Sequence, residues 1–419
     1  MKFIINGGKA LDGDIRVGGC KNSATPIIAA TLLTDQTCIL HNIPRIGDVL
    51  VILEILKSIG SRQKWLSGHS IEIDNSDINP EKLDQNLMCQ IRSSILLVGP
   101  LLARFGKVSF VTPGGCKIGS RPIDTHLEAF RDLGAIVEFD DGSGIHTIFL
   151  KNFKNDRVCL KEFSVTATEN LLMLAKAHPF AIALAAIEPH VLDLIDFLAK
   201  LGVTVAGDKS HTFKVNSGKG LSGAIEHTII NDPIEAGTLA VLASATRSNI
   251  NIVGVEESHL ELPLRKLKEF GVVFNLRGSV LGIDGMRSGL HAAKIQTLPY
   301  PGLPTDLQAP FGVLATQAKG SSLIFDIMYE GRLKYIDELR KMGADAVILD
   351  PHRAIINGPT VLHGAEIQSL DLRAGATLVI AALVAKGQSA IGSIEQIDRG
   401  YEKFDERLRE LGADIIRSD

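Results

Sequence analysis

The sequence has few aromatic residues, a single tryptophan and five cysteines among its 419 residues. The cysteines are widely spaced, at positions 20, 38, 89, 116 and 159, and none forms a Cys-x-x-Cys pair. This spacing argues against a zinc site and against a disulfide framework. No apolar run approaches the length of a membrane span, and the first residues lack the apolar core of a signal peptide. We therefore expect a cytoplasmic protein with no membrane insertion.

Neither sign of charge dominates the sequence, because 44 basic residues stand against 48 acidic ones. A net charge of −4 gives no electrostatic footprint for nucleic acid, so any anion must be bound by local groups of Arg and Lys. A hydrophobic content of 45% is ordinary for a folded protein, and the length suffices for two or three domains.

One pattern recurs six times along the chain: a helix that ends in glycine and is followed by a strand. The glycines are spaced by 68 to 74 residues, at positions 60, 134, 202, 271, 343 and 412. Glycine at this place permits the left-handed residue that ends many helices. Each copy also contains an earlier helix, rich in small apolar residues, which predicts burial. These helices are expected over residues 23–33, 91–104, 168–177, 234–246, 305–318 and 374–385. The pattern predicts an α/β fold of two domains, each with three repeated units in pseudo-threefold symmetry and the buried helices inside the sheets.

A glycine-rich loop over residues 113–122 carries Cys116 between a predicted strand and a predicted helix. Lys117, Arg121 and the nearby helix N-terminus all favour a thiolate at this cysteine. A structural cysteine on a tight turn is the alternative, but packing explains the surrounding cations poorly. We therefore expect a functional thiol.

Several cations stand at or near helix N-termini, where they oppose the helix dipole. Lys21, Arg92 and Arg373 lie in the first turns of buried helices, and Arg332 and Arg399 precede amphipathic helices. Such a placement is costly without an anion to neutralise it, so we expect a small polyanionic substrate. Ser164, Thr168 and Asp371 are better interpreted as N-caps of these helices.

Together these residues resemble the enolpyruvyl transferase family, and within it the branch that uses UDP-N-acetylglucosamine. The matching motifs are CKNSA at 20–24, GGCKIGSRP at 114–122, LPTDLQA at 303–309, DLRA at 371–374 and IDRGYE at 397–402. The resemblance covers essentially the whole chain. It implies two inside-out α/β barrel domains, one of residues 21–230 and one of residues 1–20 and 231–419. The active site would lie in the cleft between them.

The resemblance implies transfer of the enolpyruvyl group of phosphoenolpyruvate to the 3′-hydroxyl of UDP-N-acetylglucosamine, with release of phosphate, at the start of peptidoglycan synthesis. Addition followed by elimination needs a proton donor to the methylene carbon and a base for the hydroxyl. The family's pattern assigns these roles to Cys116 and Asp306, with Lys21 as a further catalytic residue. It also implies a covalent adduct of Cys116 and alkylation of this thiol by fosfomycin. No metal or organic cofactor is expected.

The resemblance also implies which residues bind the substrates. Lys21, Arg121 and Arg399 would bind the phosphate of phosphoenolpyruvate, while Arg332 and Arg373 would bind its carboxylate. The expected contacts with the nucleotide sugar are Asn22, Arg92, Arg121, Pro122, Ile123, Asp124, Thr125, Ser164, Val165, Thr166, Asp306 and Met328. Both partners are small molecules, and no nucleic acid is expected.

This sequence departs from the family's pattern at a few binding positions. Thr166 stands where glycine is common, Thr125 stands where leucine is common, and Glu162 takes the place of a lysine. The segment 328–332 replaces a more usual Phe-Glu-Asn-Arg. These changes bear on affinity for the nucleotide sugar more than on the chemistry.

Four alternatives stay open at this point. They are the shikimate-pathway enolpyruvyl transferase, a paralogue acting on another nucleotide sugar, a non-catalytic protein that binds UDP-N-acetylglucosamine, and a thiol hydrolase with His126 as base. The last is disfavoured because His126 is predicted on a helix surface with no Asp or Asn partner. The four cysteines other than Cys116 are predicted to be small buried hydrophobes.

Overall fold

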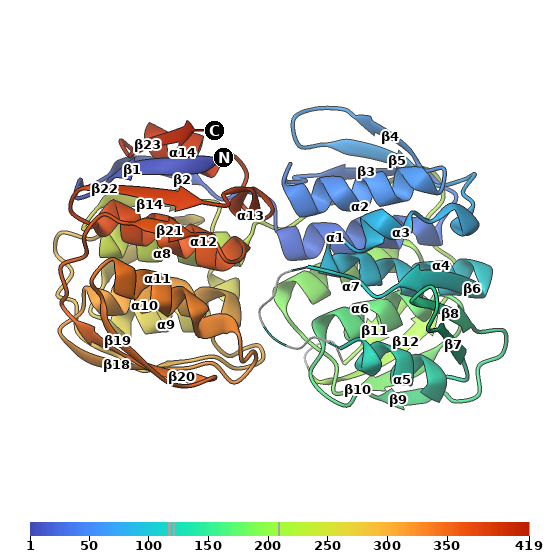
Figure 1. The fold of residues 1–419 in the computed structure, drawn as a ribbon. Helices are drawn as coiled ribbons and strands as arrows, with labels where there is room; N and C mark the ends of the chain where they lie inside the picture. The colour runs from blue at the N-terminus through green and yellow to red at the C-terminus, as the bar shows by residue number, and fades with distance from the viewer. Residues whose placement is uncertain (116–118, 120–121, 208–209, 419) are drawn as a thin grey trace. The chain divides into compact units, whose positions relative to one another are not determined.

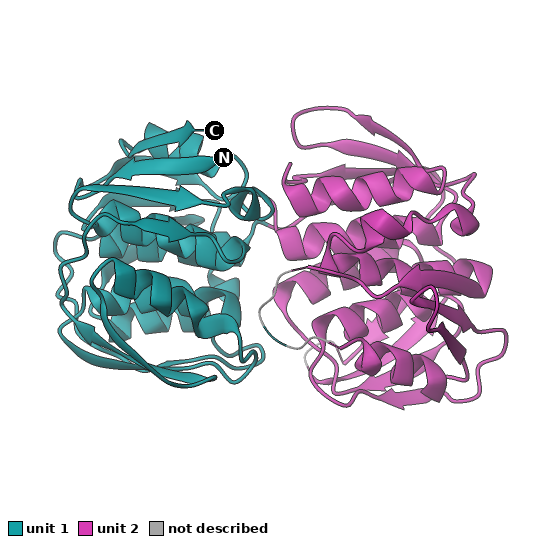
Figure 2. Ribbon diagram, in the orientation of Figure 1, with its two compact units in different colours: residues 1–18, 117–120, 231–419 teal, residues 19–116, 121–230 magenta. Residues whose placement is uncertain are grey.

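The structure is a computed structural model that describes residues 1–115, 119, 122–207 and 210–418. The chain forms two compact units, which Figure 2 shows in different colours. We call residues 19–115 with 122–230 the middle unit, and residues 1–18 with 231–418 the split unit. The predicted functional thiol, Cys116, lies outside the described residues, as do Lys117 and Arg121.

Each unit contains three copies of one repeat, as the glycine spacing predicts. A repeat runs from a buried helix through a strand, a half-buried helix and a pair of antiparallel strands to a strand that crosses to the next sheet. The crossing strand pairs in parallel with the first strand of the next repeat, as β9 does with β10 and β17 with β18. The sheets have three or four strands each, and none closes into a barrel within the described residues.

The helices of the middle unit are α1 (Lys21–Ala30), α2 (Gly47–Ser58), α3 (Gln85–Met88), α4 (Val98–Phe105), α5 (Asp124–Asp132), α6 (Val165–Leu174) and α7 (Pro189–Lys200), with 3₁₀ turns η1 (Thr31–Leu33), η2 (Pro80–Lys82) and η3 (Arg92–Leu97). Its strands are β3 (Cys38–His41), β4 (Arg62–Trp65), β5 (Ile71–Asp74), β6 (Lys107–Val111), β7 (Ile136–Asp140), β8 (Ile145–Phe149), β9 (Arg157–Cys159), β10 (Phe180–Ala183), β11 (Val203–Ala206), β12 (Thr212–Ser217) and β13 (Ile225–Thr228). They form sheets in the orders β13-β3-β5-β4, β11-β12-β10-β9 and β6-β8-β7.

The helices of the split unit are α8 (Pro233–Ala245), α9 (Glu261–Glu269), α10 (Thr305–Thr316), α11 (Tyr335–Lys341), α12 (Leu372–Val384), α13 (Glu395–Asp398) and α14 (Phe404–Glu410), with 3₁₀ turns η4 (Glu257–His259) and η5 (Arg332–Lys334). Its strands are β1 (Lys2–Asn6), β2 (Asp12–Arg16), β14 (Asn249–Val253), β15 (Val273–Arg277), β16 (Val280–Asp284), β17 (Ile295–Gln296), β18 (Gly320–Phe325), β19 (Asp345–Asp350), β20 (Arg353–Gly358), β21 (Glu366–Gln368), β22 (Gln388–Gly392) and β23 (Asp414–Ser418). The sheet orders are β21-β22-β1-β23, β15-β16-β14-β2 and β17-β18-β20-β19.

The N-terminal strands complete two sheets of the split unit. Strand β1 lies between β22 and β23 and pairs with both in antiparallel register, and β2 pairs in parallel with β14. Figure 1 shows the blue β1 beside the red strands from the other end of the chain. The repeat that begins with α12 therefore ends at the N-terminus, which makes this unit discontinuous in sequence.

The buried helices of the split unit, α8, α10 and α12, pack against one another. Small residues permit this close approach. A Cβ atom on Gly237 of α8 would lie 2.7 Å from a methyl carbon of Leu307 on α10, and one on Gly312 of α10 would lie 2.2 Å from the hydroxyl of Tyr335 on the neighbouring α11. The composition that predicts burial is thus also what allows three helices to share one core.

The six repeat glycines have the left-handed backbone expected of them. Their φ angles, for Gly60, Gly134, Gly202, Gly271, Gly343 and Gly412, lie between 77° and 107°. A side chain at these positions would strain the backbone. The prediction of six helices ended by left-handed glycine is confirmed.

The sheet β6-β8-β7 has three described strands, and a side chain takes the place of the fourth. Gln85 accepts a hydrogen bond from the Val111 amide at 2.8 Å and donates one to the Ser109 carbonyl at 3.3 Å. These are the groups of β6 that a parallel neighbour would pair. The side-chain amide therefore satisfies backbone groups that would otherwise lack a partner.

No helix within the described part of the chain is both long enough and apolar enough to cross a membrane. Cys20 and Cys38 are buried, but Cys89 and Cys159 are exposed, so the prediction of four buried cysteines is wrong for two of them. Cys159 points outward because it alternates along β9 with the buried Val158, and Cys89 lies at the end of the short helix α3.

Candidate active site

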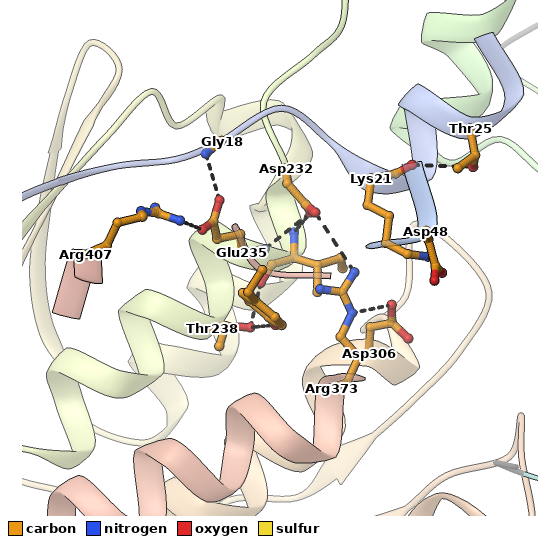
Figure 3. A network of polar contacts seen from close by, with 12 residues as sticks. Gly18, Lys21, Thr25, Asp48, Asp232, Glu235, Thr238, Asp306, Arg373 and Arg407 are labelled. Atoms are coloured by element: carbon orange, nitrogen blue, oxygen red, sulfur yellow. Dashed lines mark hydrogen bonds and ion pairs between the residues drawn. The ribbon is translucent and has the colours of Figure 1, made fainter. Parts of the chain in front are cut away.

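A compact charged cluster lies at the start of α10 in the split unit. Asp306 is the second residue of this helix, and its two carboxylate oxygens accept from different arginines. Arg332 donates from Nη2 to Oδ1 at 2.6 Å, and Arg373 donates from Nε to Oδ2 at 3.0 Å. Figure 3 shows Arg373 between Asp306 and Asp232, whose carboxylate lies 4.0 Å from its Nη2. Three predicted site residues are thus brought together.

The elements of the split unit hold this cluster in place. Asp326 accepts hydrogen bonds from the Thr305 hydroxyl at 2.7 Å and from the Met328 amide at 2.9 Å, so it ties the start of α10 to the loop after β18. Asp371 caps α12 by accepting from the Arg373 amide at 2.8 Å, which confirms its predicted role. The ring of Tyr401 lies under the Arg373 guanidinium, 5.3 Å from centroid to Cζ.

The electrostatics of the cluster favour an ionised Asp306. Burial by itself would raise the pKa of this carboxyl, but the charges and hydrogen bonds of Arg332 and Arg373 outweigh it and hold the pKa below its usual range. Two guanidinium nitrogens, Nε of Arg332 and Nη1 of Arg373, are buried without a partner among the described residues. The cluster therefore has unused donors for a further anion.

Lys21 opens α1 in the middle unit and forms an ion pair with Asp48, with 3.1 Å between Nζ and the carboxylate. Both side chains are largely buried. Asp48 lies in the first turn of α2, so a carboxylate of the protein neutralises the cation that opposes the dipole of α1. The sequence offered no signal for Asp48 as the partner of Lys21. Asn22 follows Lys21 in α1.

The predicted nucleotide-sugar residues of the middle unit lie around the starts of α5 and α6. Arg92 donates to the Pro122 carbonyl at 2.9 Å. The helix that follows, α5, begins at Asp124 rather than at the predicted Pro122. The buried Thr125 donates to Glu162 at 2.9 Å. Ile123 is buried and Pro122 is exposed.

Ser164 caps α6 as predicted, because its hydroxyl accepts from the Ala167 amide at 3.3 Å. Val165 and Thr166 are the first two residues of the helix. Thr168 is not a cap, contrary to its prediction. It lies inside α6, and its hydroxyl donates to the Ser164 carbonyl at 2.8 Å.

His126 was expected on a helix surface, and this prediction is wrong. The side chain is buried, with Nε2 3.0 Å from the Thr166 hydroxyl and Nδ1 3.2 Å from the amide nitrogen of Asn170. Burial and the charge of Arg92 lower its pKa to about 3. The spacing of Ile123, Leu127 and Phe130 identifies only the apolar face of α5. It gives no sign that His126 is also buried, because its partner Asn170 lies on α6, far away in sequence.

The remaining predicted residues are placed as follows. Arg399 follows α13 and donates to Gln396 at 3.0 Å. Met328 is held through its backbone amide. The prediction missed Tyr401 and Asp232 as neighbours of Arg373.

The sequence is similar to known proteins over nearly its whole length. A sequence model of the family described as EPSP synthase (3-phosphoshikimate 1-carboxyvinyltransferase) matches residues 5–408. UDP-N-acetylglucosamine 1-carboxyvinyltransferase 1 of Carboxydothermus hydrogenoformans is 43% identical over 418 residues, which cover 99% of this chain and 98% of the relative. UDP-N-acetylglucosamine 1-carboxyvinyltransferase of Coxiella burnetii is 41% identical, over 99% and 96% of the two chains.

Solved structures share the fold at lower sequence identity. The enolpyruvyl transferase NikO from Streptomyces tendae superposes with a TM-score of 0.90 at 22% identity, covering 100% of this chain and 98% of the other. EPSP synthase from Acinetobacter baumannii gives a TM-score of 0.73 at 18% identity, with both chains fully covered. The predicted fold class is confirmed.

Proposed function

The chain belongs to the EPSP synthase family of enolpyruvyl transferases, and from this premise we propose that it transfers the enolpyruvyl group of phosphoenolpyruvate to the 3′-hydroxyl of UDP-N-acetylglucosamine. The observation that carries the choice of acceptor is the identity of about 40% over the full length with relatives that bear this activity in their names. EPSP synthase structures share the fold at 18% identity, which does not favour a shikimate acceptor. The product serves peptidoglycan synthesis.

The reaction is an addition followed by an elimination. In the addition, the methylene carbon of phosphoenolpyruvate gains a proton and the 3′-oxygen bonds to its central carbon. In the elimination, the methyl group loses a proton and the bond to the phosphate oxygen breaks, so inorganic phosphate leaves. The protein must donate and accept protons and stabilise charge on a carboxylate and a phosphate.

Asp306 is the proposed base for the 3′-hydroxyl, and its surroundings suggest when it becomes one. While Arg332 and Arg373 both bond to it, the carboxylate is ionised but weakly basic. The carboxylate of phosphoenolpyruvate would use the unpartnered Nε of Arg332 and Nη1 of Arg373 and share their charge. Sharing the arginines would raise the pKa of Asp306 toward that of a useful base. Binding of phosphoenolpyruvate would thereby prepare Asp306 to act as base for the 3′-hydroxyl.

The other roles are proposals from the family pattern. Cys116 donates the proton to the methylene carbon and forms the covalent adduct. Lys21, Arg121 and Arg399 bind the phosphate, with Lys21 held by Asp48 at 3.1 Å. The proposal thus assigns residues of both units to one reaction, with the domain boundaries expected from the sequence.

In the middle unit, the nucleotide sugar is proposed to contact residues at or near the starts of α1, η3, α5 and α6. The set is Asn22, Arg92, Arg121, Pro122, Ile123, Asp124, Thr125, Ser164, Val165 and Thr166, with Asp306 and Met328 from the split unit. The hydrogen bond from Arg92 to the Pro122 carbonyl supports this grouping, because it joins two of these segments. The proposed compartment is the cytoplasm, where cysteine thiols stay reduced.

The test is phosphate release from phosphoenolpyruvate by the purified protein with UDP-N-acetylglucosamine, with shikimate 3-phosphate, or with no acceptor. Of these three conditions, we expect phosphate release only in the one with UDP-N-acetylglucosamine. In Cys116→Ser we expect a severe loss of this release. Release with shikimate 3-phosphate alone would overturn the choice of acceptor. Cys89→Ser is the matched control, because Cys89 is an exposed cysteine of the middle unit. Intact-mass measurement should show one fosfomycin adduct in the wild type and none in Cys116→Ser.

A further inference from the structure

The hydroxyl of Thr166 lies where the family commonly has glycine, which has no side chain to make such a contact. Thr166 is the second residue of α6 and is partly exposed. In the part of the chain that the structure describes, the one hydrogen-bond partner of its hydroxyl is Nε2 of His126, at 3.0 Å. The direction of this bond decides what the hydroxyl proton can do.

The side-chain amide of Asn170 contacts His126, so its orientation determines which nitrogen of His126 carries the proton. The Gly99 backbone amide donates to Oδ1 of Asn170 at 2.6 Å, which identifies the oxygen. The amide nitrogen therefore faces the Ile95 carbonyl at 3.0 Å, His126 Nδ1 at 3.2 Å and the Thr166 carbonyl at 3.3 Å. Glycine is needed at position 99, since a Cβ atom there would lie 2.4 Å from the backbone carbonyl oxygen of Asn170.

The tautomer of His126 follows from this amide. An NH₂ group offers hydrogens and no acceptor, so Nδ1 of His126 must present its lone pair. The single proton of the neutral ring is then on Nε2. A doubly protonated ring is disfavoured because burial and the nearby Arg92 lower the pKa of His126 to about 3. His126 is therefore a donor to the Thr166 hydroxyl.

A hydroxyl that accepts from His126 has its own hydrogen free to donate elsewhere. We propose that the Thr166 hydroxyl donates a hydrogen bond to the diphosphate of the nucleotide sugar, with His126 and Asn170 as the positioning residues that orient it. The inference rests on the proposed function, in which the nucleotide sugar contacts Ser164, Val165 and Thr166; the diphosphate is the anionic part of that substrate, and an anion is what a helix N-terminus favours. Donation from His126 polarises the hydroxyl and strengthens its own donation. The N-terminus of the α6 dipole adds positive potential at the same place.

The test compares Thr166→Val, which removes the hydroxyl at similar size, with Thr166→Ser, which keeps it. For Thr166→Val we expect the KM for UDP-N-acetylglucosamine to rise roughly tenfold or more, as for loss of a hydrogen bond to a charged group. The KM for phosphoenolpyruvate and kcat should stay within about threefold. Thr166→Ser should stay within about threefold of the wild type in all three quantities. The inhibition constant of UDP should rise in Thr166→Val as KM does.

The outcomes separate this inference from the proposed function. A wild type that releases no phosphate with UDP-N-acetylglucosamine would overturn the proposed function. An active wild type with the same KM in Thr166→Val would overturn the hydroxyl contact alone. Equal increases in both KM values would also overturn it, because they would indicate a general disturbance of α6.

The positioning role has its own test. His126→Leu should raise the KM for the nucleotide sugar as Thr166→Val does, and the double variant should show no further increase, because both changes remove one interaction. His126→Gln can still donate from its amide and should recover most of the affinity. Additive effects in the double variant, in proteins shown by circular dichroism to be folded, would remove His126 from this role.

Discussion

In the split unit, Asp306 is held between Arg332 and Arg373, whereas in the middle unit the buried His126 and Asn170 and the partly exposed Thr166 form a network without net charge. The first group has two arginines for one carboxylate, and a nitrogen of each arginine has no hydrogen-bond partner among the described residues. The second is built from neutral groups that both donate and accept, and the donor of each hydrogen bond is determined by its neighbours in the network.

The difference between these groups shows two ways of preparing a protein for an anionic ligand. Charges act over several ångströms, so an arginine can exchange one carboxylate for another with little change in geometry. Neutral hydrogen bonds depend on angle and fail when a partner moves. We therefore infer that the charged cluster serves exchange of partners, and that the neutral network serves orientation.

The largest effect is expected for Asp306→Asn. The amide cannot accept the proton of the 3′-hydroxyl, so kcat should fall roughly 100- to 10,000-fold. Steady-state phosphate release measures this loss. Asp337→Asn is the matched control, because Asp337 lies in the same unit with an exposed carboxylate. A kcat within tenfold of the wild type would mean that another group is the base.

Arg373→Met should destabilise the split unit while keeping the bulk of the side chain. The change leaves Asp306 and Asp232 with less compensating charge in a buried place, and we expect the free energy of unfolding to fall by about 3 kcal/mol. Urea denaturation measures it. Arg340→Met, with an exposed side chain, should change stability by less than about 0.5 kcal/mol. Equal stabilities for both variants would contradict a coupled cluster.

The burial of a neutral His126 should make the free energy of unfolding depend on pH. The folded pKa of His126, about 3, lies below the unfolded value of about 6.5. Between these values the unfolded chain binds more protons, so stability rises with pH. From pH 5 to pH 7 His126 should add about 2 kcal/mol, and this part of the increase should be absent in His126→Gln. Identical pH profiles for the two proteins would show that folding leaves the pKa of His126 unchanged, so that burial does not keep its ring neutral.

The smallest effect is expected at the surface of the middle unit. Lys161 pairs with Glu128, and both side chains are well exposed. Lys161→Ala should change the free energy of unfolding by less than about 0.5 kcal/mol and leave kcat and both KM values unchanged. A larger loss of affinity for the nucleotide sugar would show that a cation at this position takes part in binding, and would weaken the contrast between buried and exposed charge.

The sequence predicted correctly those features in which a residue type has one characteristic local role, such as glycine after the end of a helix or serine at its N-cap. The left-handed glycines Gly60 and Gly134 and the caps Ser164 and Asp371 depend on neighbours within a few residues. It failed for His126, whose environment depends on Asn170, 44 positions away and on another helix. It also missed Asp48 as the partner of Lys21, for the same reason.

By itself, the sequence determined the six repeats, their buried helices and the family, because periodicity, small apolar residues and motifs are local properties of the chain. Tertiary structure alone decided which strands share a sheet, including the place of β1 between β22 and β23. It also decided that Asp306 lies between two arginines and that His126 donates to Thr166. Ionisation and hydrogen-bond direction depend on which distant groups are brought within about 3 Å of one another. That proximity is a property of the folded chain.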